Sequence, residues 1–185
     1  MKIILGSGSP RRKELLQSLG YDFQVVSIDC EEIYPENLEV PKIAEYLSEL
    51  KANSYTELIS DEILITADTV VAINNEILGK PKSASEAKEM LQKLSGKTHE
   101  VYTAFTLKNA QKLVSKTDVA SVEISELSEE EIDFYIKNYQ PFDKAGSYGI
   151  QEWLGMAKVT KISGSYYTIM GLPTHLLYAS LKDFQ

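Results

Sequence analysis

The segment KIILGSGSPRRKELL at residues 2–16 decides the fold class, because it predicts a strand, a loop and a helix in direct succession. The apolar run at 2–6 predicts a strand that ends in a Gly/Ser loop. Ser9 followed by Pro10 is typical of a helix start, since serine favours the N-cap and proline the first turn. Apolar residues then recur at helical spacing as far as Leu19. This opening predicts an α/β protein.

The rest of the chain continues the alternation of strands and helices. Further strands are predicted at about 22–28, 62–68, 70–73, 76–78, 98–108, 112–125, 154–162 and 165–170. Further helices are predicted from Pro41 to about Leu58, from Ser83 to Leu94, from Ser128 to about Tyr139 and from Gly171 to near Phe184. We expect a mixed, twisted sheet with helices on both faces, forming a single domain over residues 1–185 that has room for a small lobe.

Composition excludes several classes of partner. The 185 residues include 27 acidic and 19 basic side chains, a net charge of −8, which disfavours binding to nucleic acid or to an anionic membrane. No apolar run approaches the roughly 18 residues of a membrane span. Cys30 is the single cysteine, so an intramolecular disulfide framework is impossible and the reducing cytoplasm fits best.

A cluster of basic residues stands out against this acidity. Arg11, Arg12 and Lys13 occupy the first turn of the opening helix, where cations oppose the helix dipole. Together with the hydroxyl of Ser7 and the free N–H groups of a helix start, they suit a phosphate group. The alternative is that Lys13 and one arginine are solvated surface charges. The segment lacks the third glycine of a dinucleotide-binding loop, and the chain has no Walker A motif.

Several carboxylates could take part in the chemistry of the same phosphate group. Asp68, followed by Thr69, comes at the end of an apolar strand, where a carboxylate could bind Mg²⁺ or accept a proton from water. A turn aspartate bonded to nearby backbone is the alternative. Glu31 and Glu32 could supply further oxygens to a hard cation, although adjacent glutamates in a loop are usually solvated.

Two lysines and the two histidines complete the inventory. Lys80 and Lys144 lie in tight loops, from which a flexible ammonium can reach an oxyanion. His99 and His175 show no metal-ligand spacing and no serine–histidine–aspartate order, which disfavours covalent catalysis. The residues together predict a metal-dependent site for a phosphorylated small molecule, with phosphoryl or nucleotidyl chemistry.

Six motifs, in order along the chain, resemble those of the Maf family, also called septum-formation-inhibitor-like. They are SGSPRRKELL at 7–16, ADTV at 67–70, GKP at 79–81, LSGKTH at 94–99, DKAGSYGIQ at 143–151 and GLP at 171–173. The resemblance implies hydrolysis of a nucleoside triphosphate to its monophosphate and pyrophosphate, with Mg²⁺ or Mn²⁺ as cofactor and a homodimer as the assembly.

The resemblance also implies a role for each candidate residue. Asp68 would accept the proton of the water that attacks the α-phosphorus, and would bind the metal together with Glu31 or Glu32. Lys51 and Lys80 would offset the developing charge. The residues that would hold phosphates are Ser7, Arg11, Arg12 and Lys144.

Three positions indicate a branch of that family. Arg11, Thr69 and Gln151 resemble the branch that acts on dTTP and UTP, and the Gln151 amide could bond the O4/N3 edge of a pyrimidine. The 7-methyl-GTP branch instead has a tryptophan, Ser-Asp-Gln and Ser-Glu-Gly in the three motifs. Gly6 and Glu152 depart from the usual alanine and glycine. A regulatory binding protein linked to cell division, or a nucleotidyltransferase, are the alternative functions.

Overall fold

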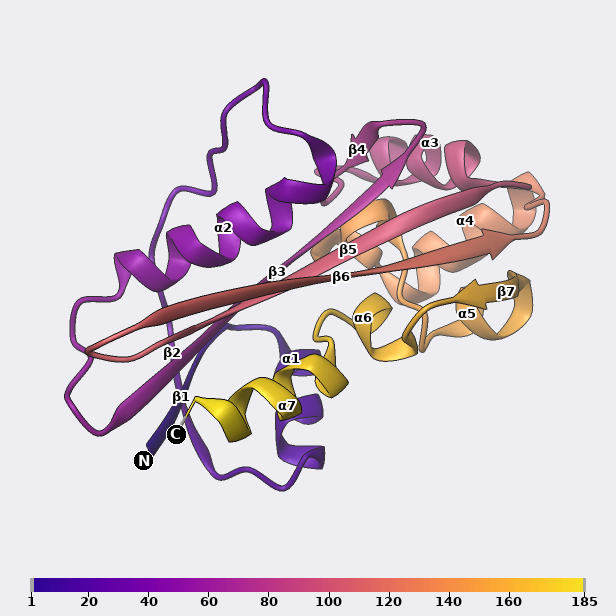
Figure 1. Ribbon diagram of the computed structural model, residues 1–185. Coiled ribbons are helices and arrows are strands. Elements are labelled where there is room, and N and C mark those ends of the chain that lie inside the picture. The colour runs from indigo at the N-terminus through magenta and orange to yellow at the C-terminus, as the bar shows by residue number, and fades with distance from the viewer. Residues whose placement is uncertain (1, 185) are drawn as a thin grey trace. The chain divides into compact units, whose positions relative to one another are not determined.

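The structure is a computed structural model that describes residues 2–184 (Figure 1). Its strands are β1 (Lys2–Gly6), β2 (Phe23–Val26), β3 (Glu62–Ile73), β4 (Glu76–Leu78), β5 (Thr98–Lys108), β6 (Leu113–Ile124) and β7 (Val159–Ser163). Its helices are α1 (Pro10–Ser18), α2 (Val40–Ser54), α3 (Ala84–Leu94), α4 (Glu129–Tyr139), α5 (Trp153–Lys158), α6 (Tyr166–Met170) and α7 (Thr174–Asp183). Two short 3-10 turns, η1 (Pro141–Asp143) and η2 (Ala145–Ser147), follow α4.

The described strands form one mixed sheet in the order β2-β1-β3-β5-β6-β7, with β4 paired to β3. β1 pairs in parallel with both β2 and β3, as strand–helix–strand connections require. β4 returns antiparallel along β3 through the turn at Asn74 and Asn75, both of which have positive φ. β7 pairs antiparallel with β6. The predicted α/β class with a mixed sheet is confirmed.

The chain divides into two compact units, each built from separate stretches of sequence. The first unit comprises residues 1–69, 103–118 and 171–185, and the second comprises residues 70–102 and 119–170. The long strands β3, β5 and β6 pass from one unit into the other. The second unit has its own apolar core, and the small lobe expected from the sequence stays a prediction.

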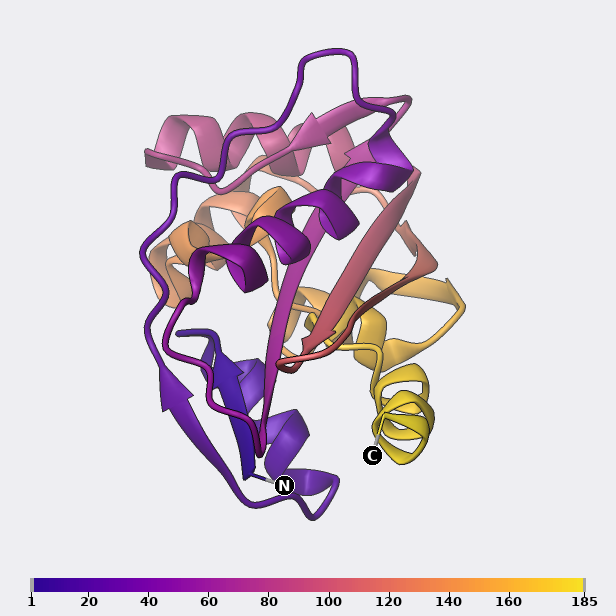
Figure 2. The ribbon, with the colours of Figure 1, turned by 60° about the vertical axis from the view of Figure 1, so that its left-hand side comes forward.

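In the first unit, helices cover both sides of the strands. Figures 1 and 2 show α2 on one side, and α1 and α7 on the other. Ile4 of β1, Leu64 of β3 and Ala52 of α2 pack together in its core, with Val26 and Ile28 against them. This core packs β1, β3 and α2 together, and the candidates Asp68 and Lys51 lie on β3 and α2.

In the second unit, the later part of β3 and the adjoining strands pack against α3 and α4. Its core includes Val71, Leu91, Val122 and Tyr135. The predicted capping box at Ser128 is confirmed, because its side chain accepts from the backbone of Glu131 and the Glu131 side chain accepts in return. At Ser83 only half of the predicted box forms, since Glu86 accepts from the backbone of Lys82 instead.

Two predictions about secondary structure were wrong. The segments at 154–162 and 165–170 were expected as strands, but most of the first is helix α5 and the second is helix α6; only β7 is extended. The predicted second helix was also too long, since α2 ends at Ser54 rather than near Leu58. In the segments at 154–162 and 165–170 a short apolar run fits helix and strand equally well, and packing decides between them.

Asp68 does not end its strand, contrary to the sequence prediction. β3 continues through Asp68 as far as Ile73, and its central part is almost fully buried. A carboxylate in the middle of a buried strand requires a partner, because burial without one costs several kcal/mol. The partner of Asp68 is Lys51.

Among residues 2–184, none of the helices has both the length and the apolar character needed to cross a bilayer.

Candidate functional site

The predicted site residues divide between the two units. The first unit carries the candidates Ser7, Arg11, Arg12, Glu31, Glu32, Lys51, Asp68 and Thr69. The second unit carries Lys80, Lys144 and Gln151.

Asp68 is paired with Lys51 in the interior of the first unit. The Asp68 side chain is 10% exposed and that of Lys51 13%, and the Lys51 ammonium donates a hydrogen bond to Asp68 Oδ1. Lys51 Nζ also lies 3.1 Å from Glu32 Oε1. The ammonium therefore bridges two carboxylates, one from β3 and one from the loop after β2. This arrangement gives the buried Asp68 carboxylate a cationic partner.

Local sequence explains how Lys51 reaches this position. Lys51 lies in the last turn of α2, where a cation complements the negative end of the helix dipole. The buried face of α2, which includes Ile43, Leu47 and Ala52, packs into the unit. Lys51 is only partly exposed beside Ala52, so its side chain is directed along the sheet toward Asp68 rather than into solvent.

Arg12 joins three separate parts of the first unit. Its Nε donates to the carbonyl oxygen of Gly171 at 2.8 Å, Nη1 to Ser7 Oγ at 3.2 Å, and Nη2 to Thr69 Oγ1 at 3.1 Å. Burial lowers the pKa of Arg12, and the negative charge of Asp68 opposes that shift. The guanidinium stays charged because an arginine pKa starts far above neutrality. Arg12 is thus a fixed cation beside the buried carboxylate.

Two residues next to Arg12 were not identified as site residues from the sequence. Thr103 of β5 is fully buried, and its hydroxyl lies 3.0 Å from Thr69 Oγ1. Gly171 has a φ of +109°, and a Cβ there would lie 3.3 Å from Thr69 Oγ1. Gly171 lies in the motif at 171–173, which contributed to the family resemblance and to the predicted start of the last helix, but no site role was assigned to it. Nothing in the sequence around Thr103 distinguishes it from other strand residues.

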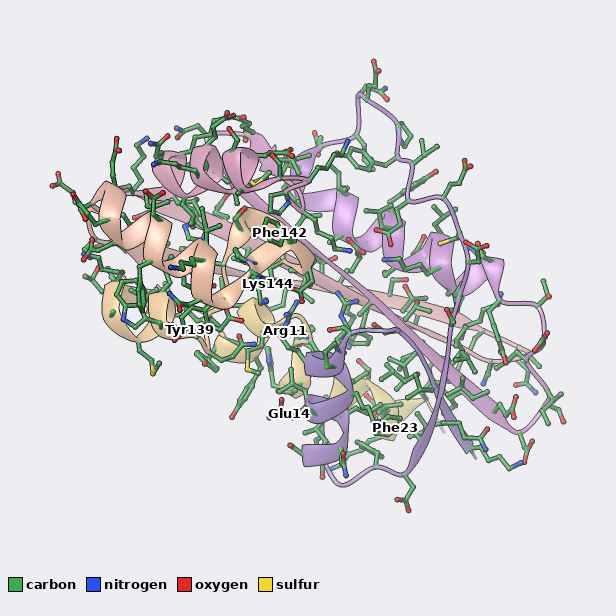
Figure 3. The ribbon with its side chains drawn as sticks, turned by 180° about the vertical axis from the view of Figure 1, so that it is seen from behind. Arg11, Glu14, Phe23, Tyr139, Phe142 and Lys144 are labelled. Atoms are coloured by element: carbon green, nitrogen blue, oxygen red, sulfur yellow. The ribbon has the colours of Figure 1, made fainter. Side chains whose placement is uncertain are left out.

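The remaining candidates of the first unit are more open. Arg11 is half-buried near the start of α1, where Figure 3 labels it, and Ser7 is half-buried at the beginning of the loop between β1 and α1. Glu31 and Glu32 are both exposed, in the loop between β2 and α2. Of these two glutamates it is Glu32 that the structure brings against Lys51.

In the second unit, Lys144 is buried and paired. It is 8% exposed, and its ammonium donates to Asp143 Oδ1 at 2.6 Å and lies 3.1 Å from Glu152 Oε1. Lys80 is exposed in the loop after β4. The backbone N–H of Gly146 donates to the carbonyl of Gly79 at 3.1 Å, so the loops that carry the two lysines are joined. Figure 3 labels Lys144.

Gln151, the third candidate of the second unit, is exposed in a turn. The turn is closed by a hydrogen bond of 3.0 Å from the Glu152 N–H to the Gly149 carbonyl. Its buried side includes Tyr148, whose hydroxyl lies 2.7 Å from Nε2 of His99. A side-chain amide in this position offers both a donor and an acceptor to solvent or to a ligand.

The donor set in the first unit fits a divalent cation that arrives with a phosphate ligand. Among residues 2–184 no three His, Cys, Asp or Glu side chains are grouped so as to hold an ion by themselves. Asp68 and Glu32 nevertheless present hard oxygens to one shared cation, the Lys51 ammonium. Mg²⁺ is commonly bound by one or two carboxylates, and phosphate oxygens of the substrate complete its coordination shell. Asp68 and Glu32 would supply two such carboxylates.

Comparisons with known proteins agree with this chemistry. The chain is 49% identical over 183 residues to a protein of Flavobacterium psychrophilum named dTTP/UTP pyrophosphatase, covering 98% of this chain and 94% of that protein. It is likewise 49% identical to a dTTP/UTP pyrophosphatase of Bacteroides thetaiotaomicron, covering 98% and 95%. In fold it is similar to the Ham1 protein of Staphylococcus aureus, with a TM-score of 0.58 over the whole of both chains at 17% identity.

The likeness to the Ham1 protein concerns the fold alone, because the sequence identity is only 17%. The sequence itself matches the family described as Maf-like protein over residues 2–184, which is all of the chain that the structure describes. The resemblance drawn from six short motifs therefore extends across the intervening helices and strands. The chain belongs to the Maf-like protein family.

Proposed function

We propose that this protein hydrolyses nucleoside triphosphates, with dTTP and UTP as substrates, to the monophosphate and pyrophosphate. The observation that carries the proposal is the likeness, at 49% identity over nearly the full length, to proteins named dTTP/UTP pyrophosphatase. The buried pair of Asp68 and Lys51 supports it, because it provides an ionised carboxylate next to a fixed cation.

The chemical step is the attack of a water oxygen on the α-phosphorus. Asp68 accepts a proton from that water as the new P–O bond forms, and the bond between the α-phosphorus and its bridging oxygen breaks. Pyrophosphate leaves with the electron pair of that bond. Lys51 is hydrogen-bonded to Asp68, so it holds the carboxylate in place before the transfer. No covalent intermediate is required.

The triphosphate is bound by the cations of the opening segment and by the metal. Arg12 uses three of its N–H groups on Gly171, Ser7 and Thr69, so within residues 2–184 two of its five remain for phosphate oxygens. Arg11 adds a second guanidinium on the same helix start. A divalent cation, held by Asp68 and Glu32 when it is bound, would neutralise charge on the phosphates.

Recognition of the base is assigned to Arg11, Thr69 and Gln151. An amide side chain can pair with the O4 and N3 atoms of uracil or thymine, and it discriminates against bases with the opposite donor pattern. Lys80 and Lys144 are assigned to charge neutralisation and phosphate binding. The pairing of Lys144 with two carboxylates means that it would have to exchange a partner to bind phosphate.

The test is a panel of nucleoside triphosphates incubated with the protein and Mg²⁺ or Mn²⁺, with monophosphate and pyrophosphate quantified separately by ion-exchange chromatography. We expect equal amounts of both products, and faster cleavage of dTTP and UTP than of GTP or 7-methyl-GTP. Faster cleavage of guanine nucleotides would overturn the substrate assignment and leave the reaction class intact. Cleavage with water as the sole acceptor would exclude an obligatory nucleotidyl transfer.

The catalytic role of Asp68 is tested by Asp68→Asn. This change keeps the size of the side chain but removes the proton acceptor, so kcat should fall by about 10²- to 10⁴-fold. Asp133→Asn is the matched control, because Asp133 of α4 forms an exposed ion pair with Lys88 of α3. Equal rates for wild type and Asp68→Asn would contradict the catalytic assignment of Asp68, whereas absence of cleavage by the wild-type protein would favour a regulatory binding role.

Assembly and location are proposed from the sequence. We place the reaction in the cytoplasm, since the single cysteine matches a reducing compartment and the substrates are cellular nucleotides. The homodimer stays a prediction of the family resemblance, and light scattering of the purified protein would test it.

A further inference from the structure

The turn that presents Gln151 is clamped from its buried side by one tyrosine. Tyr135 of α4 is fully buried, and its hydroxyl accepts a hydrogen bond from the Gly149 N–H at 2.9 Å. The same hydroxyl donates to Glu152 Oε2. One phenol group therefore binds the residues on both sides of the turn, two positions before Gln151 and one position after it.

The clamp is itself rigid. The Tyr135 ring stacks on Tyr139, with the ring centroids 5.1 Å apart, and on Trp153, the residue that follows Glu152, at 6.5 Å. Burial raises the pKa of Tyr135, and its bond to Glu152 raises it further, so the phenol remains a donor at any physiological pH. The anchor of the turn thus belongs to the core of the second unit.

Glu152 extends the clamp to a second loop. Its side chain is 18% exposed, with Oε2 on Tyr135 and Oε1 3.1 Å from the ammonium of Lys144. The fit around it is close, because a Cβ on Gly149 would lie 2.8 Å from Glu152 Cδ. The carboxylate therefore ties three segments together: α4, the loop of Lys144 and the turn of Gln151.

We propose that Tyr135 and Glu152 are positioning residues for base selection, which hold the Gln151 turn in the conformation that reads the pyrimidine edge. The inference rests on the proposed function, in which Gln151 contacts the base. Neither residue needs to touch the substrate. An exposed glutamine on a mobile turn would lose conformational freedom on binding, and a turn fixed beforehand at both ends avoids that loss. The clamp therefore acts on the affinity for the correct base and on discrimination between bases.

The direct test is Tyr135→Phe, which removes the hydroxyl and keeps the ring. We expect KM for dTTP and UTP to rise about tenfold, which corresponds to the loss of one or two hydrogen bonds. The preference for UTP over GTP in kcat/KM should fall by a similar factor, while kcat changes by less than about threefold, because the groups at the reacting phosphorus are untouched. Tyr139→Phe is the matched control on the same helix.

Glu152→Gln provides a second variant. It keeps an acceptor for Tyr135 but loses the ionic bond to Lys144, so its effect on the UTP/GTP preference should be smaller than that of Tyr135→Phe and in the same direction. Glu76→Gln is its control, since Glu76 forms an exposed ion pair with Lys93 in the same unit. Thermal unfolding followed by the fluorescence of Trp153, which is the single tryptophan, reports whether each variant is folded.

A double-mutant cycle decides whether the clamp works through Gln151. In a Gln151→Ala background, Tyr135→Phe should leave the UTP/GTP preference unchanged, because the side chain that it positions is gone. An additive effect in that background, or an unchanged KM in folded Tyr135→Phe, would overturn the inference. If the wild-type protein cleaves no nucleotide, the proposed function fails instead. Calorimetric binding of α,β-methylene-UTP and its guanine analogue then measures the same preference without turnover.

Discussion

Acidification should destabilise this protein through one buried histidine. The sequence contains two histidines, and His99 of β5 is 1% exposed. Its Nε2 is hydrogen-bonded to Tyr148 at 2.7 Å, and its Nδ1 is buried without a partner among the described residues. Burial lowers the pKa of His99 to about 4 from a starting value of 6.5. The folded protein thus holds this imidazole neutral at a pH where the unfolded chain protonates it.

The size and sign of the effect follow from proton linkage. Between pH 6.5 and about 4 the unfolded state binds the proton and the folded state does not, so the free energy of unfolding falls as the pH falls through this window. At pH 5 the loss amounts to about 2 kcal/mol relative to pH 8, and it approaches about 3 kcal/mol below pH 4. For a small protein that is a substantial part of the total stability.

The measurement is urea unfolding at pH 8 and at pH 5, followed by the fluorescence of Trp153, which lies in the same unit as His99. Carboxylates also titrate in this range, and comparison with His99→Gln cancels their contribution. We expect wild type to lose about 2 kcal/mol more than His99→Gln between the two pH values. His175→Gln is the control, since that side chain is 54% exposed. Equal losses in wild type and His99→Gln would refute the reasoning.

Three further outcomes are expected. Arg12→Lys should raise KM for the triphosphate tenfold or more in steady-state assays, because a lysine cannot reach Gly171, Ser7 and Thr69 together; an unchanged KM would contradict this. Gly146→Ala should cost about 2 to 3 kcal/mol in urea unfolding, since its φ is +69° and a Cβ would lie 2.9 Å from Val71 Cγ1. Chelation with EDTA should abolish hydrolysis without lowering the melting temperature, because the proposed cation completes its shell with substrate; a lower melting temperature would indicate a structural metal.

Much of the fold could be predicted because local signals agreed with the final packing. Three local signals each define an element without help from distant residues. They are Ser9-Pro10 at the start of α1, the capping box at the start of α4 and the turn at Asn74-Asn75. The segment from residue 153 to residue 170 carries no comparable signal. Its short apolar runs became α5 and α6 through burial of residues such as Leu154 and Thr168, which periodicity cannot reveal.

The candidate site was predictable in its residue types and less so in its connections. Lys51 and Asp68 were both proposed, but their ion pair depends on how α2 lies along β3. The choice of Glu32 over its neighbour depends on the path of an irregular loop, which no pattern records. Arg12 was expected to hold phosphate, and the structure adds that it also organises Ser7 and Thr69.

The division of the chain explains why these connections lie where they do. The chain leaves or re-enters the first unit after Thr69, before Thr103, after Asp118 and before Gly171. The Thr69 hydroxyl lies against that of Thr103, Arg12 bonds both Thr69 and Gly171, and Asp118 lies 3.9 Å from His175. Every residue at which the chain crosses is therefore held by a polar contact inside the first unit. Since each of these contacts joins segments far apart in sequence, the network depends on the tertiary structure of this unit, which local sequence patterns do not reveal.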